Sequence, residues 1–190
     1  MIYVFLADGF EEAEALVTVD VLRRAKYEVK TVGVTGEFVT GNHGITVKSD
    51  VLAADISPDE TLEAVVLPGG IPGTPNLESN EKVIEFIDYA AKEKKVLAAI
   101  CAAPSILGKR GLLKSRLATC YPGFEEFLVG AIVEKAPVCI SDNYVTANGA
   151  GSVFQFAFAL VDIIAWQKGT LEFGDFSLSQ QLEESMQCAL

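Results

Sequence analysis

Residues 96–107 read VLAAICAAPSIL. The first five are apolar and predict a buried strand, and Pro104 suits the first turn of a helix, where its missing N–H group costs no hydrogen bond. A strand that turns at once into a helix holds the side chain at the turn above the sheet edge, provided that its neighbours are small. Ala102 and Ala103 meet that condition, so the stretch predicts a sharp turn that presents Cys101.

Two interpretations of Cys101 follow. A thiol at the start of a helix faces free backbone N–H groups and the positive end of the helix dipole, which favours the reactive thiolate. The second interpretation is that Cys101 only fills space at the end of a core strand. Free cysteines are often buried and inert, and such a residue would give the same pattern. The rest of the sequence bears on this choice.

The composition limits the classes of function. At 190 residues the chain is long enough for one domain with a sizeable core, and half of its residues are apolar. The net charge of −11 argues against binding to nucleic acid or to anionic membranes. Four cysteines without CxxC spacing and a single histidine predict free thiols in the cytoplasm rather than a disulfide framework or a zinc site. We therefore expect no metal.

Short apolar runs alternate with helical patterns along the chain. Residues 2–7 are expected to form a first strand rather than a signal peptide, because no basic residue precedes them. Further strands are expected at 27–34, 64–67, 96–100 and 117–121, hairpins at 38–47 and 138–147, and helices at 11–25, 79–92, 101–111 and 153–166. Wholly apolar strands that alternate with helices predict a parallel sheet covered on both faces.

The chain is expected to form one domain over residues 1–168. The segment that follows, 169–190, is acidic, and Leu178 and Leu182 in it suggest an amphipathic helix packed on the body or on a partner. The longest uncharged run, 143–161, contains glycines and Asn148, so we interpret it as a strand, a turn and a helix rather than a membrane span.

Three unusual segments follow expected strands: Asp8–Glu14, Pro68–Gly70 and Cys101. In open α/β sheets, ligands bind beyond the carboxyl ends of the strands, where the strand order reverses. Glycines beside a nucleophile let backbone N–H groups approach it, and Gly69-Gly70 with the N–H of Ala102 would form an oxyanion hole. The coincidence of the three segments favours a reactive Cys101.

Three acids, Glu11, Glu12 and Glu14, lie at the start of the expected first helix, where the helix dipole alone favours acidic residues. One of them could still face Cys101. A carboxyl group buried there would have a raised pKa and could exchange a proton with the thiol or with a substrate carbon. The spacing leaves open which acid does so.

Four segments of the sequence resemble the ThiJ/PfpI family and, within it, the branch of the Parkinsonism-associated protein deglycase. They are residues 8–14 (DGFEEAE), 65–70 (VVLPGG), 98–104 (AAICAAP) and 149–152 (GAGS). The likeness extends over residues 1 to about 168. It implies a flavodoxin-like three-layer α/β sandwich with a mostly parallel sheet, of the class I glutamine amidotransferase type. It also implies a homodimer with a nucleophilic cysteine at the sharp turn between strand and helix.

The resemblance assigns roles residue by residue. Cys101 matches the family's nucleophile and Glu14 matches the acid that faces it, while Gly70 and Ala102 match the oxyanion-hole donors. Arg24 matches an arginine that lies near the pocket across the dimer interface. No cofactor is implied.

The sequence departs from the family after the next strand. Tyr121 stands where many members carry a histidine, and His43 is expected in a solvent-exposed turn, so a Cys–His pair is not expected. Ala102 stands where the protease branch has a histidine, and we therefore disfavour peptidase activity. Cys120, beside Tyr121, suggests a thiol that could resolve an oxidised Cys101 as a disulfide.

Three functions are compatible with these residues. The first is a cofactor-free glyoxalase or deglycase, in which Cys101 forms a hemithioacetal with a reactive dicarbonyl or a glycated group and Glu14 moves the proton. The second is a non-catalytic oxidative-stress sensor or chaperone that uses oxidation of Cys101. The third is a binding or structural protein with an inert thiol.

Overall fold

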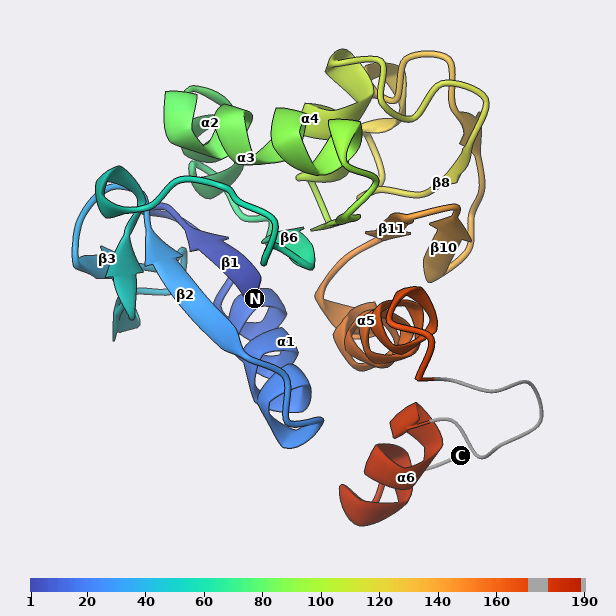
Figure 1. Cartoon of the computed structure of the whole chain (residues 1–190). Coiled ribbons are helices and arrows are strands. Elements are labelled where there is room, and N and C mark those ends of the chain that lie inside the picture. Colours follow the sequence, from blue (N-terminus) through green and yellow to red (C-terminus); the bar gives the residue numbers. More distant parts are fainter. Residues whose placement is uncertain (171–177, 189–190) are drawn as a thin grey trace.

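The computed structural model describes residues 1–170 and 178–188 (Figure 1). The strands run over Ile2–Leu6 (β1), Val29–Gly33 (β2), Phe38–Thr40 (β3), Thr46–Lys48 (β4), Val51–Leu52 (β5), Ala64–Leu67 (β6), Val96–Ile100 (β7), Leu117–Ala118 (β8), Ile132–Val133 (β9), Val138–Ser141 (β10) and Tyr144–Ala147 (β11). The helices run over Glu12–Arg24 (α1), Gly73–Glu78 (α2), Glu81–Lys92 (α3), Pro104–Lys109 (α4), Val153–Gln167 (α5) and Leu178–Ser185 (α6).

A seven-stranded sheet forms the centre of the fold. Its order is β10-β11-β7-β6-β1-β2-β5, and β10 alone runs antiparallel to its neighbour. The pairs β3–β4 and β8–β9 form two small separate sheets. The predicted parallel sheet and both predicted hairpins are thus confirmed.

Helices cover both faces of this sheet (Figure 1). On one face, α1 and α5 pack against each other and against the strands; on the other lie α2, α3 and α4. All residues of β6 and β7 are buried, as expected for strands between two helical layers. This is the three-layer α/β sandwich that the family resemblance implies.

The helix boundaries follow local sequence signals. Asn80 caps α3, because its side-chain oxygen accepts the backbone N–H groups of Lys82 and Val83. Asp88 and Lys92 lie four residues apart on α3, a spacing that suits an ion pair, but they do not pair with each other. Asp88 instead pairs with Arg110, on the loop after α4, and Lys92 contacts its neighbour Glu93. A partner supplied by the tertiary fold here replaces the local one.

One strand is shorter than expected. The predicted strand at 117–121 ends at Ala118, because the N–H of Thr119 donates to the Thr146 hydroxyl and that of Tyr121 donates to the carbonyl of Cys101. These two hydrogen bonds fasten the segment after β8 across the ends of β7 and β11. The segment therefore borders the predicted site.

The expected C-terminal helix is present as α6. Its Leu182 is buried against α5, and the Ser179 hydroxyl donates to Asp162 of that helix. Within the expected segment 169–190, positions 171–177 and 189–190 lie outside the described residues. Residues 150–167, which include α5, are long and apolar enough to cross a membrane, but 56% of that window is buried, as in a core helix.

Candidate active site

Cys101 occupies a sharp turn at the carboxyl end of β7. Its φ of 64° lies in the left-handed region, which residues other than glycine seldom adopt. Two hydrogen bonds hold this backbone conformation: Cys101 N–H donates to Ala147 at 2.9 Å, and its carbonyl accepts from Tyr121 at 2.7 Å. Pro104 follows as the first residue of α4. The predicted turn that presents the thiol is confirmed.

Glu14 is the acid that reaches this turn. It belongs to the first turn of α1, is 1% exposed, and accepts the N–H of Gly69 on Oε2 at 2.8 Å. Its side chain also forms a hydrogen bond with Cys101. The other carboxyl oxygen, Oε1, is buried without a hydrogen-bond partner among the described residues. One oxygen of Glu14 is thus free to exchange a proton.

A residue without a side chain is required between the acid and the thiol. A Cβ on Gly69 would lie 2.6 Å from the Cβ of Cys101 and 2.8 Å from Oε2 of Glu14. Both distances are shorter than van der Waals contact, so any larger residue would push the pair apart. Gly69 therefore sets the spacing of the site.

The environment raises the pKa of both groups. Burial raises the pKa of Glu14 to about 7, against the opposing effect of the Gly69 N–H and of the contact with Cys101. Burial, followed by the charge of Glu14 and the hydrogen bond to it, raises the pKa of Cys101 to about 12. Of the two interpretations of Cys101, this environment opposes the thiolate, because burial beside a carboxylate outweighs the effect of the helix start. Glu14 has the lower pKa of the two, so it is the group that ionises first as the pH rises.

Two backbone N–H groups face the sulfur. Those of Ala102 and Gly70 form hydrogen bonds with the Cys101 sulfur and lower its pKa. Gly70 has a φ of 95°, and a Cβ there would lie 2.3 Å from the carbonyl oxygen of Gly9. A glycine is therefore needed for this N–H to point at the thiol. The two donors suit an oxyanion formed on an atom bonded to that sulfur.

The neighbouring acid Glu12 has a structural role. Its Oε1 accepts the N–H groups of His43 and Ile45 at 2.8 and 3.3 Å, and its Oε2 lies 2.9 Å from the ring Nδ1 of His43. Burial favours a higher pKa for Glu12, but the hydrogen bonds outweigh it and lower the pKa. Glu12 thus ties the β3–β4 hairpin to α1. This contact has no signal in the sequence, because 31 residues separate its partners.

Glu11, Glu12 and His43 also offer ligand atoms of the kinds that bind metals, and these atoms lie within 4.8 Å of one another. Both oxygens of Glu12 already accept hydrogen bonds, so a cation would have to displace the His43 ring. Although His43 lies in the turn as expected, with its side chain 64% exposed, it is paired with Glu12 rather than only solvated.

Two weaker sequence candidates lie at different distances from the thiol. Tyr121 is half exposed, and its ring lies against Gly149, where a Cβ would be 3.4 Å away. Its backbone N–H is hydrogen-bonded to Cys101. Arg24 pairs with Asp20 near the end of α1, ten residues and about 15 Å along the helix from Glu14. Within one chain Arg24 does not belong to the site.

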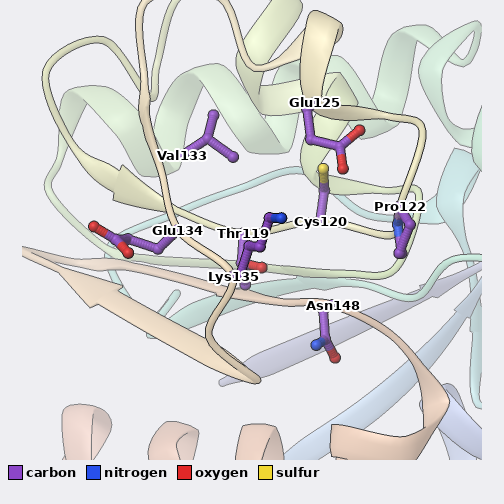
Figure 2. Close-up of a pocket in the computed structure, with 8 residues that line it drawn as sticks. All are labelled: Thr119, Cys120, Pro122, Glu125, Val133, Glu134, Lys135 and Asn148. Atoms are coloured by element: carbon purple, nitrogen blue, oxygen red, sulfur yellow. The ribbon is translucent and has the colours of Figure 1, made fainter.

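The second thiol faces another layer. Cys120 is buried among the side chains on the α3 and α4 face of the sheet, whereas Cys101 packs with the α1 and α5 face. In Figure 2 the sulfur of Cys120 points towards Glu125. Burial, then the charge of Glu125, raises its pKa to about 11, although the N–H of Phe124 opposes this. The geometry does not favour Cys120 as a resolving thiol for Cys101.

Comparison with known proteins gives consistent matches. The model of the DJ-1/PfpI family matches residues 1–163. Protein dj-1beta of Drosophila melanogaster is 31% identical over 172 residues, which are 89% of this chain and 91% of the relative. A protein named as a deglycase from Pyrococcus abyssi is 31% identical over 165 residues, 86% and 98% of the two chains. The crystal structure of a DJ-1 superfamily protein from Salmonella typhimurium superimposes with a TM-score of 0.88 at 32% identity, covering 100% of this chain and 98% of that one.

Proposed function

This chain is a member of the DJ-1/PfpI family, and from that membership and the contacts around Cys101 we propose that it is a cofactor-free, cysteine-dependent enzyme of the glyoxalase or deglycase type. Relatives named as deglycases support this class of reaction. The observation that carries the proposal is the contact between a buried carboxyl group, with a pKa of about 7, and a thiol that two N–H groups face. We expect reactive dicarbonyls such as methylglyoxal, or groups glycated by them, as substrates.

The first step uses Glu14 as a base. Its carboxylate takes the proton of the Cys101 thiol as the sulfur adds to the aldehyde carbon, and the carbonyl π bond becomes an oxyanion. The N–H groups of Gly70 and Ala102 would stabilise that charge. Because the pKa of Glu14 is near neutrality, it can accept this proton and then return it to the oxyanion to give a hemithioacetal.

The second step moves a proton between carbons. Glu14 removes the hydrogen of the hemithioacetal carbon, the resulting enediol is reprotonated on the neighbouring carbon, and a thioester forms. Water then cleaves the bond between sulfur and carbon, releasing a 2-hydroxy acid and restoring the thiol. The overall reaction converts methylglyoxal and water into lactate, so no external oxidant or reductant is consumed. With the hemiaminal of methylglyoxal and an amine as substrate, the C–S bond replaces the C–N bond, Glu14 passes the thiol proton to the departing amine, and the same hemithioacetal results.

The test is lactate formation from methylglyoxal, with a glycated amino acid as a second substrate. Cys101→Ser should reduce turnover to background, and Glu14→Gln should reduce it by about 10²–10⁴-fold. Cys139→Ser is the matched control, because Cys139 is a buried free thiol on β10 that plays no part in the proposal. Turnover that persists in the Cys101 variant would overturn the proposed mechanism.

One observation also favours redox sensing as a second candidate. Protonated Glu14 has a free oxygen, Oε1, beside Cys101 and could donate a hydrogen bond to a sulfinate formed there by two equivalents of peroxide. Mass spectrometry of the Cys101 peptide after mild peroxide treatment tests this candidate. The sensor would be favoured by three results together: stable sulfinate in the wild type, a smaller amount of sulfinate in Glu14→Gln, and negligible turnover of methylglyoxal.

The assembly and location are proposed on other grounds. We propose a homodimer, as the resemblance implies, in which Arg24 of one protomer approaches the site of the other. We place the protein in the cytoplasm because its four cysteines are free. Sedimentation velocity would test the dimer.

A further inference from the structure

We propose that Glu11, Glu12 and His43 form a binding site for one zinc ion at the start of α1. Ligand atoms of these three side chains lie within 4.8 Å of one another. We call this group the hairpin site, because His43 lies in the turn between β3 and β4. The site is separate from Cys101 and Glu14, and the proposed reaction does not use the ion. A failure of either proposal would therefore leave the other standing.

The donors come from two segments that only the fold brings together, so the sequence spacing, from which no metal is expected, does not reveal them. Glu11 and Glu12 begin α1, and 31 residues separate Glu12 from His43. His43 Nδ1 lies 2.9 Å from Oε2 of Glu12 and 3.6 Å from Oε2 of Glu11. Two ligands of a tetrahedral zinc ion, each bonded at about 2.0–2.1 Å, are roughly 3.3 Å apart. Zinc therefore needs movements of only roughly 0.4 Å at these two contacts.

The His43 ring can make this movement. A cation would take the place of the proton between its Nδ1 and Oε2 of Glu12, which displaces the ring outwards. The His43 side chain is 64% exposed, so the ring can move into solvent. The same exposure lets a water molecule complete the coordination as the fourth ligand, as in zinc sites with three protein ligands.

The backbone of the hairpin holds Glu12 in position for such an ion. Its Oε1 accepts the N–H groups of His43 and Ile45, which leaves Oε2 directed at the His43 ring. Hydrogen bonds of this kind orient the carboxylate ligands of metal sites. A Cβ on Gly41 would lie 2.3 Å from both the carboxyl carbon and Oε1 of Glu12, so the turn needs a glycine there. The carboxylate is therefore fixed before an ion binds, which lowers the entropic cost of binding.

The charges of the three side chains match a divalent cation. Within the part of the chain that the structure describes, the carboxylate of Glu11 has no ion-pair partner other than His43. Two carboxylates and a protonated imidazole leave one negative charge unbalanced, whereas two carboxylates and a neutral imidazole balance an ion of charge +2. An imidazole nitrogen is a ligand that suits zinc, while Mg²⁺ and Ca²⁺ take oxygen ligands. The donor set therefore favours zinc over these two ions.

The test is a titration of the full-length protein, labelled with ¹⁵N, with zinc chloride while amide chemical shifts are recorded. We expect saturable shifts at residues 10–13 and 41–46, and no comparable shifts with magnesium chloride. Glu11→Gln should weaken zinc binding at least tenfold, because it removes one charged ligand and leaves the contacts of Glu12 with the hairpin in place. His43→Ala should weaken it at least tenfold as well, and this variant keeps the backbone N–H that donates to Glu12.

Two controls separate the hairpin site from other zinc ligands. Glu81→Gln removes an exposed acid from the first turn of α3, changes the net charge by the same amount as Glu11→Gln, and should leave zinc affinity unchanged. Cys101→Ser removes the active-site thiol and should still show the shifts at the hairpin site. Three results would overturn the proposal: no saturable shift at the hairpin site, unchanged affinity in either the Glu11 or the His43 variant, or loss of zinc binding in Cys101→Ser.

Discussion

Replacing Glu14 with glutamine should stabilise the protein at alkaline pH while lowering the proposed activity. The folded-state pKa of Glu14 is about 7, above its ordinary value of 4.5, so the fold favours the protonated form. Between these two values the unfolded chain releases its proton first, and the free energy of unfolding falls as the pH rises. The loss is complete above about pH 7 and absent below about pH 4.5.

The magnitude follows from the size of the pKa shift. A difference from 4.5 to about 7 corresponds to roughly 3 kcal/mol at pH 8. Glutamine stays neutral at every pH and keeps an oxygen that can accept the Gly69 N–H. The stability of the Glu14→Gln variant relative to the wild type should therefore increase by roughly 3 kcal/mol between pH 4.5 and pH 8.

Urea denaturation at several pH values measures this difference directly. Any constant effect of the substitution, such as the new NH₂ group in the buried site, cancels when the two pH values are compared. Glu126→Gln, at an exposed position, is the matched control and should show no such pH dependence. A relative change below about 1 kcal/mol would refute the reasoning, because it would mean that Glu14 is not held against ionisation.

Three further outcomes are expected. The kcat/KM of the wild type for methylglyoxal should rise about tenfold from pH 6 to pH 8, because the proposed base is the ionised form of Glu14, whose pKa is about 7. A kcat/KM that does not change with pH would exclude that role. Gly69→Ala should lower turnover at least tenfold while the circular dichroism spectrum stays the same, because the added Cβ would lie 2.6 Å from the Cβ of Cys101. Unchanged kinetics would contradict this spacing argument. Asn80→Ala should lower the free energy of unfolding by about 1 kcal/mol without changing activity, since it removes the cap of α3, and equal urea midpoints would show that the cap contributes nothing.

Much of the fold could be predicted because its signals are local. The apolar runs that become β6 and β7 are buried on both faces, so they show no alternation and indicate a covered parallel sheet. The turn at Cys101 was predictable from its small neighbours and from Pro104. Strand ends were less predictable, since the end of β8 depends on Thr146 and Cys101, which are distant in sequence.

The chemistry of the site was less predictable than its position. Spacing placed three acids near the thiol, and the family resemblance selected Glu14, which the structure places in contact with Cys101. The sequence left open whether Cys101 is a thiolate or a buried thiol. The burial and the carboxylate contact that raise its pKa arise only when α1 packs against the end of β7.

Glu12 and Glu14 lie two residues apart on α1, and little of either side chain is exposed, but Glu14 lies much deeper in the protein. Their pKa values move in opposite directions for two reasons. Burial costs the Glu14 carboxylate more, and only one backbone donor, that of Gly69, meets it, whereas Glu12 lies near the surface and accepts hydrogen bonds from His43 and Ile45. For enzyme design, the depth of an acid and the number of donors around it are therefore the two properties to copy together. A glutamate grafted into a shallow site with several N–H donors would become an anchor like Glu12, with a pKa too low to relay protons near neutral pH.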